Sequence, residues 1–427
     1  MWADILAMYA LWMMMTYLTN VWKLDLTHAA AIINVFMGVV GILPIGTAFL
    51  VDTLLGNFWM LLLSSLSYSM VGFSLSCLLR SFQICLSSFG YRLEYCLLIV
   101  RSHGSQGLGF LSMSTPPVLS KATHTCSAYE PECIGNTQKI LFYLSLALIA
   151  VGLAGHVTSL VPFMAEQTTL GEEEDEIDME KEFPWLCAGS FAVILVPIIG
   201  AISLPYIHPW SVRFGIPAIL TLVATLLFLS GSCSYYFVGP QGSSLPTIFR
   251  VLLASVSKLR HRCPQDANQL YEIRNADIYS VPHTCGLRCL DKAAIIVPSD
   301  LEHPERSRWR LCRVTEVEET KSMIRMIPMW MTFIICGIVI SIGNTYFIEQ
   351  ANHMSRKVGH LKVPLPILLL FQDIAKTHFT KYFFAFIGII GSSGSRKYAA
   401  PIGIATSMIF AVLCCITAAK VETRRLD

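Results

Sequence analysis

The chain has 427 residues, of which 54% are hydrophobic and only 14% charged, and its formal net charge is +2. Globular domains carry about 25% charged residues, so this composition excludes an ordinary water-soluble domain. The small net charge also gives no support to nucleic-acid binding, which requires clustered Lys and Arg.

Eight stretches of the chain run for 18 residues or more without Asp, Glu, Lys or Arg. They are residues 5–22, 26–51, 53–79, 140–165, 183–212, 214–249, 326–348 and 398–419. About 20 apolar residues are needed for a helix to cross a bilayer, and the absence of period-two alternation excludes a membrane β-barrel. We therefore predict an all-α polytopic membrane protein with about nine spans, roughly at 3–22, 29–52, 57–78, 138–163, 184–206, 213–238, 325–350, 363–390 and 398–419.

Residues 71–106 interrupt the third predicted span. They mix apolar runs with scattered Arg, at the point where a helix would be expected to continue. The segment is either a tenth, poor membrane segment or an insertion, and we predict an insertion foreign to the underlying fold.

Cys126 and Cys133 lie in the polar loop that precedes the fourth predicted span. A disulfide would form between them if this loop faces an oxidising compartment, and two free thiols are equally compatible with the sequence. Most of the other cysteines lie inside apolar runs, where Cys behaves as a small hydrophobic residue.

Two polar connections indicate the domain organisation. Residues 172–182 are almost entirely acidic, as expected of a solvated loop. Residues 239–324 are rich in Lys and Arg, which is typical of a cytoplasmic loop. The predicted organisation is a transmembrane bundle at 1–238, a cytoplasmic loop at 239–324 and a second bundle at 325–427, with the two-cysteine loop on the opposite side.

Several strings resemble, in order, those of the plant nitrate/peptide transporters, the proton-coupled oligopeptide branch of the major facilitator superfamily. They are YLTNVWKLD (17–25), NVFMGVVGILPIGTAFLVDTLLGNFW (34–59), STPPVLS (114–120), LDKAAI (290–295), LCRVTEVEETKSMIRMIPMW (311–330), TYFIEQANHM (345–354) and VETRRLD (421–427). The resemblance covers nearly all of the chain apart from 71–106. Each string alone is weak evidence for the family, but seven strings in the same order as in the family identify it.

The resemblance implies two six-helix halves with a substrate site between them near the midplane. By this comparison the chain contains the first half and three helices of the second. It ends where helices ten to twelve would begin, and we therefore expect a truncated gene model or splice form.

Two family motifs are altered. The first helix of the family usually carries E-x-x-E-R, a carboxylate–guanidinium cluster suited to proton coupling, whereas Ala3 and Asp4 stand at its last two positions. The Lys of the fourth helix is replaced by Val157, with His156 beside it. His156 titrates near neutrality and could carry a proton, or it could be a hydrogen-bonded core residue.

The candidate pathway residues lie at the ends of later spans. Glu349 and Gln350 close the seventh span, where a carboxylate could either anchor at the interface or face the pathway. Asp373 and Lys376, with the nearby His378 and Lys381, lie in the weakly apolar eighth segment, where they could line a wet cavity or mark a helix end.

Asp52 and Gly56 form the turn between the second and third spans. Gly relieves backbone crowding and Asp can cap the following helix, so a plain capped turn explains both residues. The resemblance implies a gating turn.

The leading hypothesis is a secondary active transporter, coupled to protons, for nitrate, peptide or another small anionic or zwitterionic solute. The alternative is a truncated, non-transporting remnant or regulator that binds a full-length relative. No P-loop, G-x-S-x-G or metal-spaced Cys/His cluster is present, so we predict no enzyme, metal or cofactor.

The predicted partners are membrane lipid, a small solute and a proton, without nucleic acid. Homo- or hetero-oligomerisation is left open. The sequence does not distinguish the plasma membrane from the vacuolar membrane.

Overall fold

The computed structural model describes two compact units. One comprises Met1–Pro240 with Val339–Asp427, and the other comprises Gln241–Ile338. The described residues are 2–68, 107–115, 134–171, 195, 198–200, 202–240, 242, 244–261, 270–271, 284, 286–296, 311–355, 357–358, 361–363, 367, 371, 375, 379, 382 and 396–426.

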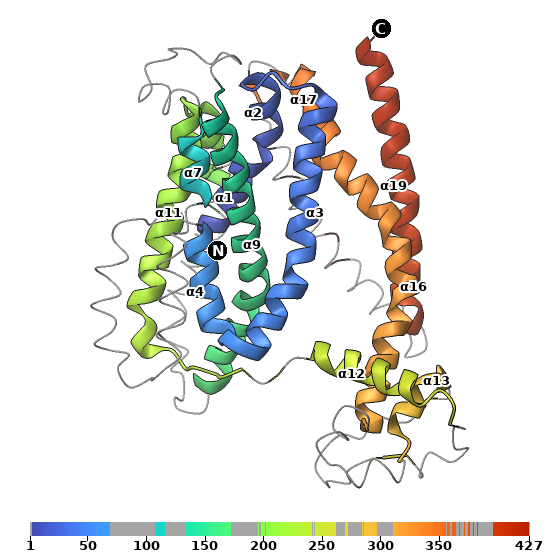
Figure 1. The fold of residues 1–427 in the computed structure, drawn as a ribbon. Helices are drawn as coiled ribbons and strands as arrows, with labels where there is room; N and C mark the ends of the chain where they lie inside the picture. Colours follow the sequence, from blue (N-terminus) through green and yellow to red (C-terminus); the bar gives the residue numbers. More distant parts are fainter. Residues whose placement is uncertain are drawn as a thin grey trace. The chain divides into compact units, whose positions relative to one another are not determined.

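The larger unit is built from helices (Figure 1). In chain order its α-helices are α1 (Trp2–Trp12), α2 (Met14–Asn20), α3 (Leu26–Leu50), α4 (Gly56–Tyr68), α7 (Gly107–Met113), α9 (Asn136–Gly171), α11 (Trp210–Ser230), α17 (Ile348–His353) and α19 (Arg396–Leu426). Two π-helical turns, η1 (Val51–Leu55) and η7 (Gly343–Phe347), and two 3-10 turns, η3 (Leu204–Tyr206) and η4 (Ser232–Ser234), join or extend them. The strands β1 (Lys357–Val358) and β2 (Leu361–Lys362) form one short antiparallel pair.

The core of the larger unit forms around the first two helices. Tyr17 of α2 is fully buried and its ring contacts Phe142, Trp210 and Phe214 at centroid distances of 6.5, 5.2 and 5.3 Å. These aromatic side chains come from α9 and α11, so the first helix pair is enclosed by later helices. The prediction of an all-α fold is confirmed for the described residues.

Helix α9 packs closely against α4 because a small residue lies between them. A Cβ added at Gly155 would lie 2.6 Å from the Cβ of Ser64 and 2.8 Å from the Cε of Met60. Small residues permit such approaches between membrane helices. One residue further on, His156 Nε2 lies 2.8 Å from Ser65 Oγ, which ties the same two helices together.

Five helical stretches among the described residues are long and apolar enough to cross a membrane. They are Leu26–Ser67, Asn136–Thr168, Trp210–Ser230, Val314–His353 and Ile402–Leu426. The first contains both α3 and α4, between which the chain reverses direction (Figure 1). Most of the predicted spans at 184–206 and 363–390 falls outside the described residues, and the count of nine stays a prediction.

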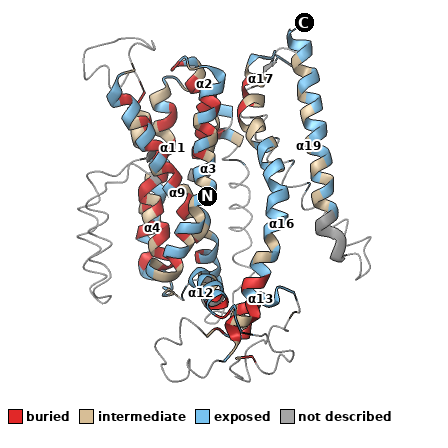
Figure 2. Ribbon diagram, turned by 45° about the vertical axis from the view of Figure 1, so that its right-hand side comes forward, coloured by how far each residue is buried: buried red, intermediate tan, exposed pale blue. Residues whose placement is uncertain are grey.

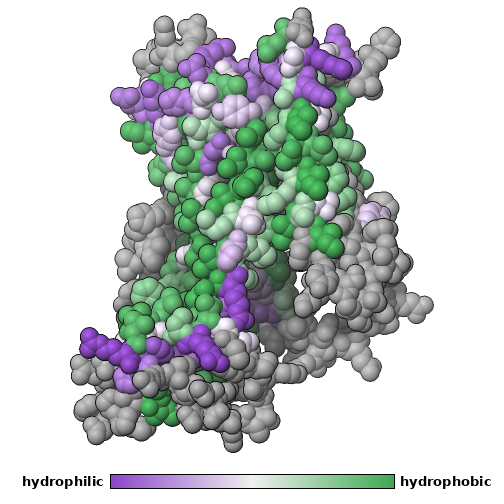
Figure 3. Space-filling view, turned by 90° about the vertical axis from the view of Figure 1, so that its right-hand side faces the viewer, coloured by the Kyte–Doolittle hydropathy of each residue, from purple (hydrophilic) through white to green (hydrophobic). Residues whose placement is uncertain are grey.

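The surfaces of these helices are apolar, as a lipid solvent requires. Figure 3 shows hydrophobic side chains over much of the visible face of the larger unit, below a band of hydrophilic ones. Figure 2 shows long exposed stretches along α19, on which Ile409, Phe410 and Val412 are 62%, 56% and 60% exposed. Large exposed apolar areas are unusual for a protein in water and normal for one in hydrocarbon.

Gly56 makes the turn between α3 and α4. Its φ is +76° and its ψ is 169°, a region that is essentially restricted to glycine. A Cβ at this position would lie 3.1 Å from the carbonyl oxygen of Val238. The turn is further held by Asn57, whose Nδ2 donates to Glu166 Oε1 of α9 at 2.6 Å.

The smaller unit contains the helices α12 (Ser244–Ser257) and α13 (Arg288–Asp291), the 3-10 turn η6 (Lys292–Ala294) and most of α16 (Val314–Ile342). Fully buried Lys321 of α16 forms its polar centre. Its Nζ lies 2.6 Å from Asp291 Oδ1 and 2.7 Å from Glu318 Oε1, and it donates to the carbonyl oxygen of Thr284 at 2.9 Å. The ammonium group therefore pairs with two buried carboxylates and fixes α13 against α16.

We expect Gly56→Ala to destabilise the larger unit by about 1–3 kcal/mol, because alanine cannot adopt the backbone conformation without strain. The thermal unfolding temperature of the purified protein in detergent measures the effect. The control is Gly38→Ala in α3, where an added Cβ has no atom within 4 Å. Equal unfolding temperatures for the two variants would contradict the role assigned to Gly56.

We expect Lys321→Met to destabilise the smaller unit by about 3–5 kcal/mol, because it removes the buried ammonium group that pairs with Asp291 and Glu318. The rate of limited proteolysis within residues 241–338 should rise accordingly. Arg313→Met, at an exposed position of the same unit, should change stability by no more than about 0.5 kcal/mol. Unchanged proteolysis of the Lys321 variant would show that the ion cluster does not hold the unit together.

Candidate functional site

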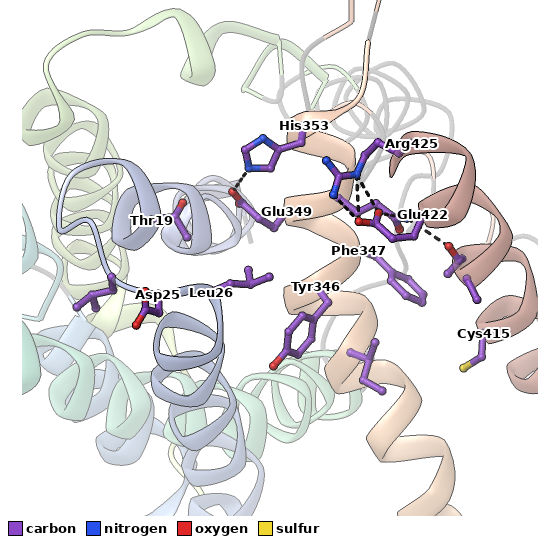
Figure 4. A pocket seen from close by; sticks show the side chains of 15 residues that line it. Thr19, Asp25, Leu26, Tyr346, Phe347, Glu349, His353, Cys415, Glu422 and Arg425 are labelled. Carbon is purple, nitrogen blue, oxygen red and sulfur yellow. Dashed lines mark hydrogen bonds and ion pairs between the residues drawn. The ribbon is translucent and has the colours of Figure 1, made fainter. Parts of the chain in front are cut away.

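A cavity of about 810 Å³ lies inside the larger unit, between the α2–α3 connection, the end of the seventh predicted span and α19 (Figure 4). It is lined by Thr19, Leu24, Asp25, Leu26, Ile342, Tyr346, Phe347, Glu349, Gln350, His353, Cys415, Ala418, Ala419, Glu422 and Arg425. Segments that are more than 300 residues apart in the sequence thus share one cavity.

Glu349 is the buried carboxylate of this cavity. Its side chain is 7% exposed, and its Oε1 lies 3.0 Å from Nε2 of His353, one helical turn later (Figure 4). Its Oε2 is buried and has no hydrogen-bond partner among the described residues. A buried carboxylate oxygen without a hydrogen bond is costly, so this oxygen is a position at which a further donor group could bind. His353 is 61% exposed and connects the pair to solvent.

A second polar group joins α17 to α19. Gln350 Nε2 donates to Glu422 Oε2 at 2.8 Å and to the carbonyl oxygen of Ala418 at 3.2 Å. Glu422 also forms an ion pair with Arg425 in the next turn of α19. The two helices are therefore connected through side chains that line the cavity, and movement of one helix relative to the other would break these bonds.

The π-helical turn η7 precedes Glu349 and Gln350 and affects which face of the helix these two residues occupy. The turn spans Gly343–Phe347, and both Tyr346 and Phe347 line the cavity. A π-helical turn inserts one residue into the helical register and is frequent at functional sites. Thr345 in the same turn is fully buried and donates to the carbonyl oxygen of Ser341 at 2.8 Å.

The structure brings together only some of the predicted site residues. Glu349 and Gln350 both line the cavity, whereas His156 lies elsewhere in the larger unit, against Ser65. Asp52 lies in η1, half-buried, beside the Gly56 turn.

Other predicted residues lie outside the described part of the chain. They are Asp373, Lys376, His378, Lys381, Cys126, Cys133 and the whole of 71–106. The side chains of Ala3 and Asp4 are likewise not described. Their assignments stay predictions, as does the gating role of Asp52 and Gly56.

Three polar cavity residues, His353, Glu422 and Arg425, were not predicted from the sequence. His353 follows Glu349 by four residues, which is the spacing at which helical side chains meet, so a local signal existed. Glu422 and Arg425 are likewise one helical turn apart and form an ion pair, but the bond from Gln350 to Glu422 had no such signal, because only the packing of α17 and α19 creates it. In the described part of the chain no group of three or more His, Cys, Asp or Glu side chains is arranged to hold a metal ion.

Comparison with known proteins identifies the family. Residues 107–427 match the profile of the POT family. The chain is 40% identical over 429 residues to Protein NRT1/PTR FAMILY 5.5 of Arabidopsis thaliana, an alignment that covers all of this chain and 72% of that protein.

Two further Arabidopsis relatives, NRT1/PTR FAMILY 5.6 and 5.7, are 28% and 27% identical over 97% of this chain. The chain spans 66% and 64% of their lengths. The family expected from the short sequence strings is therefore confirmed by alignments along the whole chain. The protein belongs to the POT family of nitrate/peptide-type transporters and is an integral membrane protein with the helical fold of the major facilitator superfamily.

Proposed function

We propose that the protein is a secondary active transporter, and not an enzyme, that couples proton movement to that of a small anionic or zwitterionic solute such as nitrate or a peptide. Family membership supports transport of this general type. The single observation that carries the proposal is the cavity with Glu349 at its wall, because it provides a solute-sized space next to a buried carboxylate with one unbonded oxygen.

The position of the cavity suits alternating access. It is lined by the α2–α3 connection from the first half of the chain and by α17 and α19 from the second. Transport in this superfamily is largely a rocking of one half against the other around a central site. The volume of about 810 Å³ lies within the range of about 300–1,000 Å³ that is typical of small-molecule sites.

The chain direction, taken with the predicted cytoplasmic loop, supports one side of the membrane as the side from which the cavity is reached. The Lys- and Arg-rich loop before α16 is predicted to be cytoplasmic. A helix that starts on that side and crosses the bilayer ends on the other, and the cavity residues lie at the end of the α16–η7–α17 stretch. We therefore propose that this cavity opens away from the cytoplasm.

The side chains offer separate places for a proton and for a solute. Glu349 can accept a proton that arrives through exposed His353, and protonation removes the cost of a buried charge. Arg425 and Gln350 present N–H donors that now bond Glu422. A carboxylate or nitrate group could compete with Glu422 for these donors, because planar oxyanions match a guanidinium group.

We expect Glu349→Gln to abolish the dependence of uptake on the pH gradient, because glutamine cannot exchange a proton. The test compares uptake of labelled nitrate and dipeptide into cells that lack endogenous transport, at acidic and neutral external pH. Wild-type uptake should rise at acidic pH, whereas uptake by the variant should be equal at both values.

The matched control is Glu319→Gln, which removes an exposed carboxylate from α16 and should leave the pH dependence intact. Retained pH dependence in the Glu349 variant would remove this residue from the coupling mechanism. Absence of any uptake by the wild-type chain, with the protein detected at the membrane, would contradict the proposal of transport itself.

A further inference from the structure

The cavity of the larger unit carries more negative than positive charge. Its lining includes the carboxylates of Asp25, Glu349 and Glu422 but the guanidinium group of only one arginine, Arg425. With His353 neutral, two negative charges of this lining are uncompensated, and with His353 protonated one is. A concave surface lined by one sign of charge raises the local concentration of solutes of the opposite sign. The lining therefore favours a solute with a cationic group over a simple anion.

The positive charge of Arg425 is already engaged by a neighbouring side chain. Its Nε donates to both carboxylate oxygens of Glu422, at 3.1 Å to Oε1 and 3.0 Å to Oε2, and the two side chains form an ion pair. The amide nitrogen of Gln350 likewise donates to Glu422 and to the carbonyl oxygen of Ala418. An anion such as nitrate would have to displace Glu422 before it could bind these donors.

Glu349 offers a binding position that is still open. Only 7% of its side chain is exposed, and its Oε1 is bonded to His353, whereas Oε2 is buried without a hydrogen-bond partner among the described residues. An ammonium group has three N–H donors and a positive charge. Hydrogen bonds between charged groups are roughly twice as strong as those between neutral ones. An ammonium group of a solute would therefore supply Glu349 with both a donor and a positive charge.

Other groups of the cavity wall also suit a cation. The rings of Tyr346 and Phe347 line the cavity (Figure 4), and the faces of aromatic rings attract ammonium groups. Asp25 lines it on the side of the α2–α3 connection, where it is exposed and its side chain makes no capping hydrogen bond to α3. This carboxylate can accept a further N–H bond from the same solute.

We infer that the cavity recognises its solute through an ammonium group, which binds Glu349 and lies against Tyr346 and Phe347. The inference rests on the proposed function, because it takes this cavity as the solute site. From the solutes proposed there it selects zwitterionic amines and excludes nitrate, which has no cationic group. The carboxylate of a zwitterion replaces Glu422 at Arg425, while its ammonium group offsets the negative charge of the wall.

A matched series of ligands tests this inference on the purified full-length protein in detergent. Isothermal titration calorimetry at neutral pH measures the binding of alanyl-alanine, its C-terminal amide, its N-acetyl derivative and nitrate. We expect alanyl-alanine and the amide to bind, because both have an ammonium group. The N-acetyl derivative and nitrate lack it and should bind about tenfold more weakly or not at all.

The variant Glu349→Gln should weaken the binding of alanyl-alanine and of its amide by about tenfold, because glutamine has no charge to offer the ammonium group. Its affinity for the N-acetyl derivative should stay as in the wild type. The matched control is Glu319→Gln, which removes an exposed carboxylate from the smaller unit and should bind the whole series as the wild type does. Elution as a single species in size-exclusion chromatography confirms that each variant is folded.

Several results would overturn the inference. Equal affinities of the wild type for alanyl-alanine and its N-acetyl derivative, or no binding of either, would show that the ammonium group is not recognised, and these results need no variant. Nitrate binding as tight as that of the amines would show an anion site instead. Unchanged affinity of the Glu349 variant for the amide would place the ammonium group elsewhere. These measurements do not involve uptake, so a failure of transport would contradict the proposed function and leave the binding pattern intact.

Discussion

The absence of water in the bilayer core is the constraint on which the structure depends. Every backbone polar group there must bond within its own segment, which makes the spans helical, and charge is sparse because each buried charge requires a partner. The need for a partner applies to a buried charge anywhere in a protein, and two buried groups in the described chain meet it to different degrees. Lys321 is enclosed by two carboxylates, whereas buried Glu349 is paired through only one of its oxygens. The first arrangement is a structural ion cluster, and the second leaves one carboxylate oxygen without a bond.

The same constraint explains how the helices are held to one another. Hydrophobic burial does not drive helices together in lipid, so close packing and hydrogen bonds take over this role. Gly155 allows α9 to approach α4, and Ser65 bonds His156 beside that contact. Gln350 and Glu422 connect α17 with α19 in the same way, but their hydrogen bond borders a cavity. In the proposed function a solute competes for these donors, whereas the contact between α4 and α9 has no part in solute binding.

Local composition made much of the fold predictable, whereas contacts created by helix packing were missed. The helical fold, the family and the position of Glu349 and Gln350 at a cavity were all accessible, because apolar runs and short strings are local signals. The partners of Gln350 could not be predicted from the sequence. Glu422 lies 72 residues later, and only the packing of α17 against α19 brings it to Gln350. His156 shows the reverse case. Its chemistry favoured a proton pathway, whereas the structure places it against Ser65, away from the cavity of Glu349.

Residues 239–324 show why average composition can hide a packed core. Over its full length the segment is polar and basic, which predicts a cytoplasmic loop and gives no reason to expect lipid contact. Within it, α12 places its large apolar side chains on one face and its small residues on the other. Only the helical periodicity, together with the burial of Val251 and Ala254, distinguishes the face of α12 that packs in the core from the face that is exposed. The apolar residues of a polar loop therefore need to be assigned face by face, because the average composition of the loop does not show which of them form a core.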